Sequence, residues 1–208
     1  KIQEIEQRLA RACERAGRKR EEVLLLGASK YANAEKIREA YQCGVRAFGE
    51  NRAQDFLKKF EELKDIPIDW HFIGNLQTNK VKYIIDKVSL IHSLDRPSLA
   101  EEIQKRAERL GKVQDVLIEV NVGKEETKGG VYEEDLEKLF EYCLSLKNLR
   151  VLGLMAIPPY KENPEEVRPY FVKLRKLKEK LEELYKLKLP HLSMGMSEDF
   201  EVAVEEGA

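Results

Sequence analysis

Short apolar runs alternate along this chain with longer segments in which apolar residues recur at every third or fourth position. Such runs are typical of strands buried on both faces of a sheet, and the recurring spacing is typical of amphipathic helices. The first segment shows the helical spacing at Ile2, Ile5, Leu9, Ala12 and Ala16. We therefore expect helices and strands to alternate from one end of the chain to the other.

Seven segments are predicted to be strands. They cover residues 23–30, 45–51, 68–74, 89–95, 116–122, 149–157 and 192–196, and a short helix is expected over 198–204. Strands that alternate with helices at this spacing indicate a parallel sheet with helices outside it. Open doubly wound sheets share this pattern. Seven strands without an obvious break favour an α/β fold of the (β/α)8 TIM-barrel type.

The eighth strand of such a barrel is missing from this sequence, which stops at Gly207 and Ala208 where that strand is expected. We expect the natural chain to continue past Ala208 with an eighth strand. No linker, low-complexity tract or sharp change in composition divides the sequence. Residues 1–208 are therefore predicted to form one domain.

The composition of the chain argues against several kinds of binding partner and site. Charged residues make up 36% of the chain and nearly cancel to a formal net charge of −1, which argues against binding to nucleic acid or anionic lipid. The apolar runs are too short to span a membrane. Cys13, Cys43 and Cys143 show neither metal-ligand spacing nor a disulfide framework. These features favour a reducing cytoplasm and predict no metal site.

The first predicted strand carries the first candidate for chemistry. Its apolar run from Val23 to Leu26 looks fully buried, and small residues and Lys30 follow it. Among small apolar neighbours the charged form of an amine is disfavoured, so the neutral amine becomes available to form a Schiff base with an aldehyde. The alternative is a lysine that extends from the strand end into water.

Further polar and small residues fall where other predicted strands end. In a barrel of parallel strands, functional groups gather at these carboxyl ends. Asn51, His71, Asn121 and Met155 occupy such positions, and so does the turn at residues 193–197. We therefore expect these residues to surround a common site.

The 193–197 turn consists of Ser193, Met194, Gly195, Met196 and Ser197 and is the second candidate. Small residues before a helix expose backbone N–H groups, the helix N-terminus favours negative charge, and two hydroxyls add donors. The turn is therefore predicted to bind phosphate. The alternative is a turn that only caps the helix, with both methionines filling the core.

The two candidates together point to one ligand. An amine that can bind an aldehyde and a turn that can bind a phosphate lie at strand ends of the same predicted barrel. Pyridoxal 5′-phosphate carries an aldehyde and a phosphate on one flat ring. We therefore expect this cofactor to bind here as a Schiff base on Lys30.

Several stretches of the sequence resemble the pyridoxal phosphate homeostasis protein family, which is similar to the barrel domain of alanine racemase. They are Leu-Gly-Ala-Ser-Lys at 26–30, Phe-Gly-Glu-Asn at 48–51, Trp-His-Phe-Ile-Gly at 70–74, Leu-Gln-Thr-Asn-Lys at 76–80, Glu-Thr-Lys-Gly-Gly at 126–130, Gly-Leu-Met-Ala-Ile at 153–157 and Leu-Ser-Met-Gly-Met-Ser at 192–197. These stretches run through most of the chain in the family order.

The resemblance implies roles for individual residues. Lys30 would hold the cofactor covalently, Asn51 would lie near the ring hydroxyl, and His71 would lie near the ring or the lysine. The remaining cofactor-binding residues would be Met155, Ser193, Met194, Gly195 and Ser197, with both serines and the glycine at the phosphate. Family members continue past the position of Ala208 with an Arg-x-Gly segment whose arginine lies near the pyridine nitrogen, and this segment cannot be assigned here.

The resemblance implies a protein of intracellular pyridoxal phosphate homeostasis without efficient catalysis of its own. Recipients would be apo-enzymes that depend on the cofactor. The alternative is an amino-acid racemase, which needs a base on each face of the cofactor. In the related racemases the opposing tyrosine comes from another subunit with an additional domain, and this chain has no room for one. That absence also favours a monomer, and a scaffold without a ligand is the third alternative.

Four other residues have simpler interpretations. His92 is predicted to be a satisfied core or barrel-lining histidine, His191 to pack near the turn, and Trp70 to belong to the core. Lys128 either reaches an anion or is a solvated loop lysine.

Overall fold

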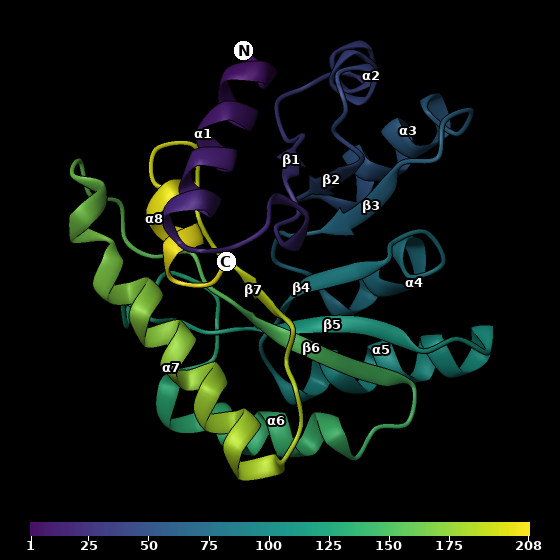
Figure 1. Cartoon of the computed structure of the whole chain (residues 1–208). Helices are drawn as coiled ribbons and strands as arrows, with labels where there is room; N and C mark the ends of the chain where they lie inside the picture. The colour runs from purple at the N-terminus through teal and green to yellow at the C-terminus, as the bar shows by residue number, and fades with distance from the viewer.

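The computed structural model describes residues 1–208 and contains one sheet of seven parallel strands in chain order. The strands are β1 (Leu26–Ala28), β2 (Ala47–Glu50), β3 (Asp69–Phe72), β4 (Leu90–Leu94), β5 (Gln114–Glu119), β6 (Leu149–Met155) and β7 (His191–Ser193). The sheet curls into a half-barrel (Figure 1). β1 and β7 are its two edges, because β1 pairs only with β2 and β7 only with β6.

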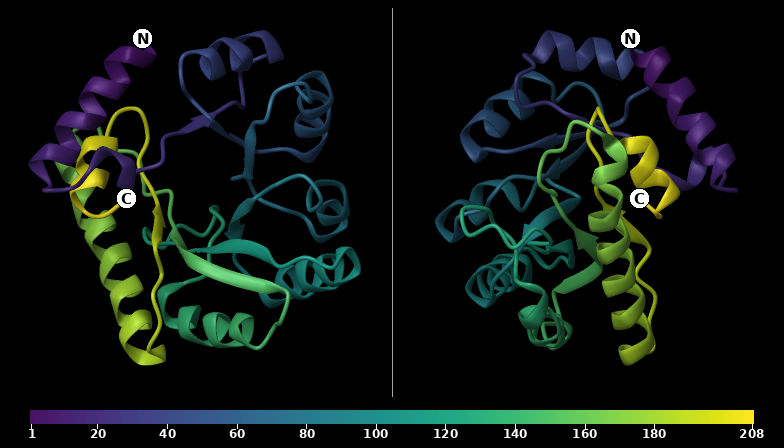
Figure 2. Two further views of the ribbon diagram at one scale, coloured as in Figure 1. Left: turned by 45° about the vertical axis from the view of Figure 1, so that its right-hand side comes forward. Right: turned by 90° about the vertical axis from the view of Figure 1, so that its left-hand side faces the viewer.

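Helices follow the strands and cover the outer side of the curled sheet (Figures 1 and 2). They are α1 (Ile2–Arg15), α2 (Ala34–Gln42), α3 (Ala53–Glu62), α4 (Val81–Ile84), α5 (Pro97–Leu110), α6 (Leu136–Leu144), α7 (Arg168–Tyr185) and α8 (Phe200–Glu205). Four short 3-10 helices are η1 (Arg20–Glu22), η2 (Thr78–Lys80), η3 (Glu133–Asp135) and η4 (Pro164–Glu166). Asn33 begins α2 by accepting the Lys36 N–H at 2.9 Å, and Pro97 lies in the first turn of α5.

The predicted fold class is confirmed. All seven predicted strands are present in the predicted order, each with helical structure before the next, and no eighth strand is present. This is the arrangement of a (β/α)8 TIM-barrel-type fold that is open between β1 and β7.

The start of the chain's first strand differs from the prediction. The apolar run from Val23 to Leu26 is not fully buried, because β1 begins only at Leu26 and Leu24 is 60% exposed. β1 is an edge strand, so one side of this segment has no neighbouring strand to cover it. The expected burial of a central strand therefore does not apply here.

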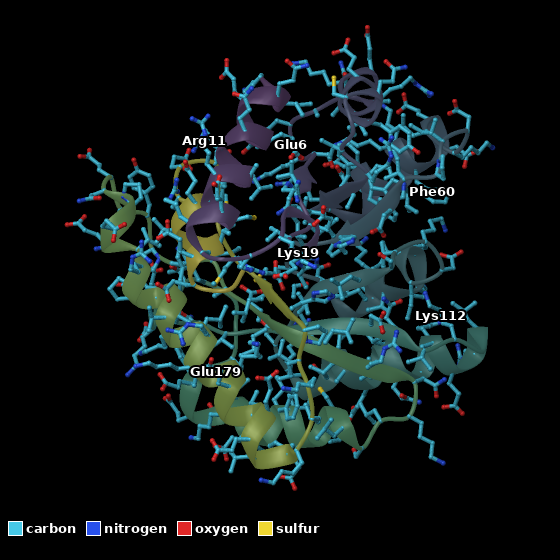
Figure 3. All side chains as sticks on the ribbon, in the orientation of Figure 1. Glu6, Arg11, Lys19, Phe60, Lys112 and Glu179 are labelled. Carbon is cyan, nitrogen blue, oxygen red and sulfur yellow. The ribbon has the colours of Figure 1, made fainter.

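The main core lies between the sheet and its helices. Trp70 on β3 packs edge-on against Phe56 of α3 with ring centroids 5.3 Å apart, and its predicted place in the core is confirmed. Charged side chains lie on the far side of the helices, as Arg11 on α1 and Glu179 on α7 show (Figure 3). None of the helices has the length and apolar character that crossing a membrane requires.

Helices α1 and α8 lie side by side although they come from opposite ends of the chain (Figures 1 and 2). Arg8 of α1 pairs with Glu201 of α8 at 2.7 Å, and Arg15 pairs with Glu205 at 3.3 Å. Arg18 donates to the carbonyl of Ala208 at 2.6 Å. These contacts join the segment before β1 to the segment after β7 on the outside of the open barrel.

Candidate functional site

The curled sheet surrounds a cavity of about 890 Å³. Every second residue of a strand faces this interior, because side chains alternate between the two faces of a strand. β3 contributes Asp69 and His71, β4 contributes Leu90 and His92, and the carboxyl ends of β1 and β7 also line the cavity. Chemistry-bearing side chains from distant parts of the sequence therefore meet in one space.

Most of the predicted site residues line this cavity. They are Lys30, Asn51, His71, Met155, Ser193, Met194 and Gly195. Ser197 is exposed and does not line it, and its carbonyl instead accepts a hydrogen bond from Arg8 of α1 at 3.2 Å. The structure thus brings together the carboxyl ends of β1 and β7, as the strand order predicts.

Lys30 is exposed at the mouth of the cavity, and its Nζ lies 5.1 Å from the ring centroid of Tyr31. The expectation that small apolar neighbours would strip water from this amine is therefore wrong. The reason is the same as for Leu24: β1 is an edge strand and is covered on one side only. The residue lines the cavity and is open to solvent.

A buried ion pair supports the backbone next to Lys30. The Glu50 side chain is 1% exposed and accepts hydrogen bonds from Lys59 Nζ at 3.0 Å and from the Ser29 hydroxyl. Lys59 Nζ also donates to the Ser29 carbonyl at 2.6 Å. Glu50 and Lys59 therefore hold the residue that precedes Lys30 from two sides, a support that sequence reasoning missed.

The 193–197 turn offers free backbone donors. The N–H groups of Met194, Gly195 and Ser197 donate to no protein acceptor, whereas the Met196 N–H donates to Asp199 Oδ1 at 2.6 Å. Gly195 has a φ of +103°, and a Cβ there would lie 2.9 Å from the Cβ of Ala203. Only glycine fits this position, so the turn keeps its shape and its free donors.

The helix after this turn is shorter than expected. α8 begins at Phe200 rather than at Glu198 and has six residues. A helix of this length adds little field at its N-terminus, so the turn's own N–H groups are its main donors to an anion. An amine and a set of free N–H groups on one cavity fit a ligand that carries an aldehyde and a phosphate.

Three histidines lie near one another in the interior. His71 Nδ1 and His92 Nε2 are 2.9 Å apart, His71 Nε2 lies 3.2 Å from Asp69 Oδ2, and His92 Nδ1 lies 2.7 Å from Ser193 Oγ. Burial and the neighbouring His71 lower the pKa of His92 to about 3, so its imidazole is neutral. The prediction of a satisfied, barrel-lining His92 is confirmed. His191 is exposed at the start of β7, so the expectation that it packs is wrong.

The partnership of His71 with Asp69 and His92 was not predicted. Alternation along residues 69, 71 and 73 and along 90, 92 and 94 could have placed these side chains on the inner face. The register that puts His71 beside His92 depends on how β3 pairs with β4, which the sequence pattern does not specify.

A second buried carboxyl group lies at the end of β5. Glu119 is 9% exposed, and burial together with the nearby Asp95 raises its pKa to about 7. Asp95 accepts the Gly130 N–H at 3.0 Å and pairs with Arg96 at 2.8 Å. Lys128 in the same loop is exposed and pairs with Glu125 at 3.0 Å, which agrees with a solvated loop lysine.

Residues 2–206 match the family model described as alanine racemase, N-terminal domain. The chain is 64% identical over 208 residues to a pyridoxal phosphate homeostasis protein of Aquifex aeolicus, a match that covers 100% of this chain and 91% of that protein. It is 40% identical over 207 residues to a pyridoxal phosphate homeostasis protein of Pseudomonas aeruginosa, covering 100% of this chain and 88% of that protein.

A solved structure is similar over nearly the whole chain. It is PipY of Synechococcus elongatus with PLP bound, which is 34% identical and has a TM-score of 0.83. The match covers 98% of this chain and 94% of PipY. The similarity therefore extends over nearly the whole fold.

Proposed function

Because this chain belongs to the family of the alanine racemase N-terminal domain, we propose that it binds pyridoxal 5′-phosphate and takes part in intracellular pyridoxal phosphate homeostasis. The observation that carries the proposal is the meeting of Lys30 with the 193–197 turn on one cavity. The names of the curated relatives and the PLP bound to PipY support it.

Several residues of the cavity have a role in this proposal. When bound, the cofactor supplies an aldehyde that an amine can attack and a conjugated ring that withdraws electrons. Lys30 provides the attacking amine. The free N–H groups of the 193–197 turn and the Ser193 hydroxyl donate to the phosphate, while Asn51, His71 and Met155 lie around the ring.

We propose that this chain holds the cofactor without efficient catalysis of its own. A racemase needs a base on each face of the ring, and Lys30 is one such base. Tyr31 is the only tyrosine that lines the cavity, and it is 89% exposed with no hydrogen bond to hold its hydroxyl. A side chain this loosely held is poorly placed to act as the opposing base, which supports the binding role over the racemase alternative.

The proposal also covers the recipients of the cofactor, the oligomeric state and the cellular compartment. Apo-enzymes that depend on pyridoxal phosphate are the proposed recipients, and the protein is proposed to act as a monomer in the cytoplasm. The thiols of Cys13, Cys43 and Cys143 are all free, which supports a reducing compartment. Sedimentation of the purified protein with and without pyridoxal phosphate measures the oligomeric state.

Borohydride reduction followed by peptide mapping tests the central claim. The proposal expects a pyridoxyl group on Lys30, and expects Lys30→Ala to remove both the label and the visible absorbance of the bound cofactor. Lys128→Ala is the matched control, because Lys128 is also an exposed lysine in a loop at the carboxyl end of the barrel. Labelling chiefly at Lys128 or Lys80 would contradict the proposal.

A coupled assay with alanine and serine tests the absence of efficient racemisation. We expect no turnover above that of the Lys30→Ala protein purified in the same way, which controls for contaminating racemase. Turnover that depends on Lys30 and falls in Tyr31→Phe would instead support the racemase alternative.

A further inference from the structure

A continuous line of hydrogen-bonding groups crosses the interior of the barrel. It runs from the Ser89 hydroxyl to Asp69, then through His71 and His92, and ends at the Ser193 hydroxyl. These residues come from β3, β4, β7 and the segment before β4. His71 and His92 are both 4% exposed, and every ring nitrogen of the pair has a partner in this line.

The direction of each hydrogen bond follows from the negative charge on Asp69. The neighbouring His71 and Ser89 lower the pKa of Asp69, so its carboxylate is ionised and accepts from His71 Nε2–H. With neutral histidines, His71 Nδ1 then accepts from His92 Nε2–H, and His92 Nδ1 accepts from the Ser193 hydroxyl. One pattern of protons therefore satisfies the whole line.

In this pattern the Ser193 proton points at His92 and away from any anion at the 193–197 turn. For Ser193 to donate to a phosphate, His92 must instead donate through Nδ1–H and accept through Nε2. His71 must then donate from both ring nitrogens, which requires an imidazolium beside the Asp69 carboxylate. That reversal takes up one proton from solvent and breaks no heavy-atom contact.

We propose that His71 and His92 couple the binding of a phosphate group at Ser193 to the uptake of one proton. This inference rests on the proposed function, because it takes the 193–197 turn as the phosphate site. His71 and His92 act here as positioning residues. His71 stores the proton, and His92 transmits the reversal to the serine hydroxyl.

Binding of the phosphate group in its monoprotonated form would also require the uptake of one proton. Its P–OH can donate to Ser193 Oγ while Ser193 continues to donate to His92. Because the second pKa of a phosphate monoester is about 6, the free ligand at pH 8 is a dianion and must again gain one proton to bind in this way. Both arrangements predict the uptake of one proton, and the protonation of the His71 ring distinguishes them.

Three titratable groups face the histidine pair. Asp69 lies on its own strand, and Asp115 of β5 also lines the cavity but already pairs with Arg150 at 2.7 Å. His191 of β7 is the third titratable group nearby; its side chain is exposed, and partial desolvation of the ring and the neighbouring His71 lower its pKa, which favours the neutral form. Asp69 is thus the carboxylate left to stabilise an imidazolium.

Calorimetry with pyridoxine 5′-phosphate measures the proton directly. This probe has the phosphate but no aldehyde, so Lys30 does not react with it. Titrations at pH 8 in buffers of different ionisation enthalpy should give an uptake of about one proton per ligand, and affinity should weaken about tenfold per pH unit above pH 8. Binding without proton uptake would overturn the inference.

Three variants assign the effect to the line of histidines. His92→Gln and His71→Gln keep a polar side chain that can donate and accept but does not titrate, so uptake should fall to near zero in both. His191→Gln is the matched control, because His191 lines the same cavity but makes no hydrogen bond through its side chain. Full uptake in His92→Gln would assign the proton to another group and overturn the inference.

Nitrogen NMR of the histidine rings provides a readout that needs no activity. In the protein without ligand, both His71 and His92 should carry their proton on Nε2, and pyridoxine 5′-phosphate should convert His71 to the doubly protonated ring. Unchanged tautomers in the complex would place the proton on the phosphate and overturn the role of His71. A His92 that carries its proton on Nδ1 without ligand would also overturn the inference. If pyridoxal phosphate labels Lys30 but no proton is taken up, only this inference fails; if Lys30 is never labelled, the proposed function fails.

Discussion

At the scale of single residues, the buried ion pair of Glu50 and Lys59 shows how buried charges can fix the position of a reactive amine, that of Lys30. Glu50 and Lys59 are 1% and 12% exposed at their side chains, and together they hold Ser29 by its hydroxyl and its carbonyl. Neither residue lines the cavity. Their effect on the site is therefore carried by the backbone at residues 29 and 30.

Replacing Lys59 by methionine should destabilise the protein strongly, because it leaves the Glu50 carboxylate buried without its cation. Removal of one partner from a buried ion pair costs about 3–5 kcal/mol. Urea denaturation measures this loss, and Lys64→Met is the control, because Lys64 pairs with Glu61 in the open, where both side chains are more than 60% exposed. Adding Glu50→Gln to Lys59→Met should restore part of the stability, and a double variant as unstable as Lys59→Met would contradict this explanation.

The two serines of the 193–197 turn should differ in their effect on the phosphate. Ser193 lines the cavity, whereas Ser197 is exposed outside it, so Ser193→Ala should weaken pyridoxal phosphate more than Ser197→Ala does. A hydrogen bond to a charged group contributes about 1.5–3 kcal/mol, which corresponds to roughly 10- to 150-fold in affinity.

Pyridoxal, which lacks the phosphate, is the control ligand for both serine variants and should be affected much less. Fluorescence or absorbance titrations compare the two ligands on each variant. Equal weakening of pyridoxal and pyridoxal phosphate by Ser193→Ala would mean that the turn only caps α8.

At the scale of elements, the pairing of β6 with β7 depends on a glycine. Gly153 lies opposite His191, and a Cβ at Gly153 would lie 1.8 Å from the His191 carbonyl oxygen. Backbone atoms cannot move aside as a side chain can. The residue at position 153 therefore decides whether β7, and with it the 193–197 turn, can lie next to β6.

Gly153→Ala should displace β7 and weaken phosphate binding while Lys30 on the opposite edge remains intact. Gly49→Ala is the matched control, since a Cβ there would meet only side-chain atoms of Ile73 and Leu26 at 2.9–3.1 Å. Overpacking of that kind typically costs about 1–3 kcal/mol. Hydrogen exchange should show β7 amides exposed in Gly153→Ala and protected in Gly49→Ala, and protected β7 amides in both would contradict the prediction.

The sequence predicted the order of strands and helices better than it predicted the exposure of residues on the edge strand β1. Alternation of apolar runs and amphipathic segments was enough for seven strands in order, because each parallel strand here needs its own helix. The exposure of Leu24 and Lys30 was missed, because burial depends on whether a strand has a neighbour on both sides. The contact of His92 with Ser193, 101 positions apart in sequence, depends on the curvature of the whole sheet.

At the scale of the whole molecule, two buried groups should give opposite pH dependences of stability. The pKa of His92 is lowered to about 3, so between pH 3 and 6.5 the unfolded chain binds the extra proton and stability rises with pH. The pKa of Glu119 is raised to about 7, so between pH 4.5 and 7 the folded protein binds the extra proton and stability falls as pH rises.

Between pH 4.5 and 6.5 these slopes, each about 1.4 kcal/mol per pH unit, should largely cancel. In Glu119→Gln, stability should rise with pH because only the His92 effect remains. In His92→Gln, stability should fall as pH rises because only the Glu119 effect remains. Urea denaturation at half-unit steps of pH measures both slopes. Parallel curves for the two variants would show that neither group has the titration inferred here.

The open edge between β1 and β7 has a mechanical consequence. Small changes in twist at each of the six strand pairs add up between β1 and β7. Lys30 and the 193–197 turn lie at the carboxyl ends of these two edge strands, and α1 with α8 joins the segments that flank them on the outside. A rigid ligand that contacts both strand ends would limit this change in twist, so its departure should make the whole curled sheet more mobile rather than one loop.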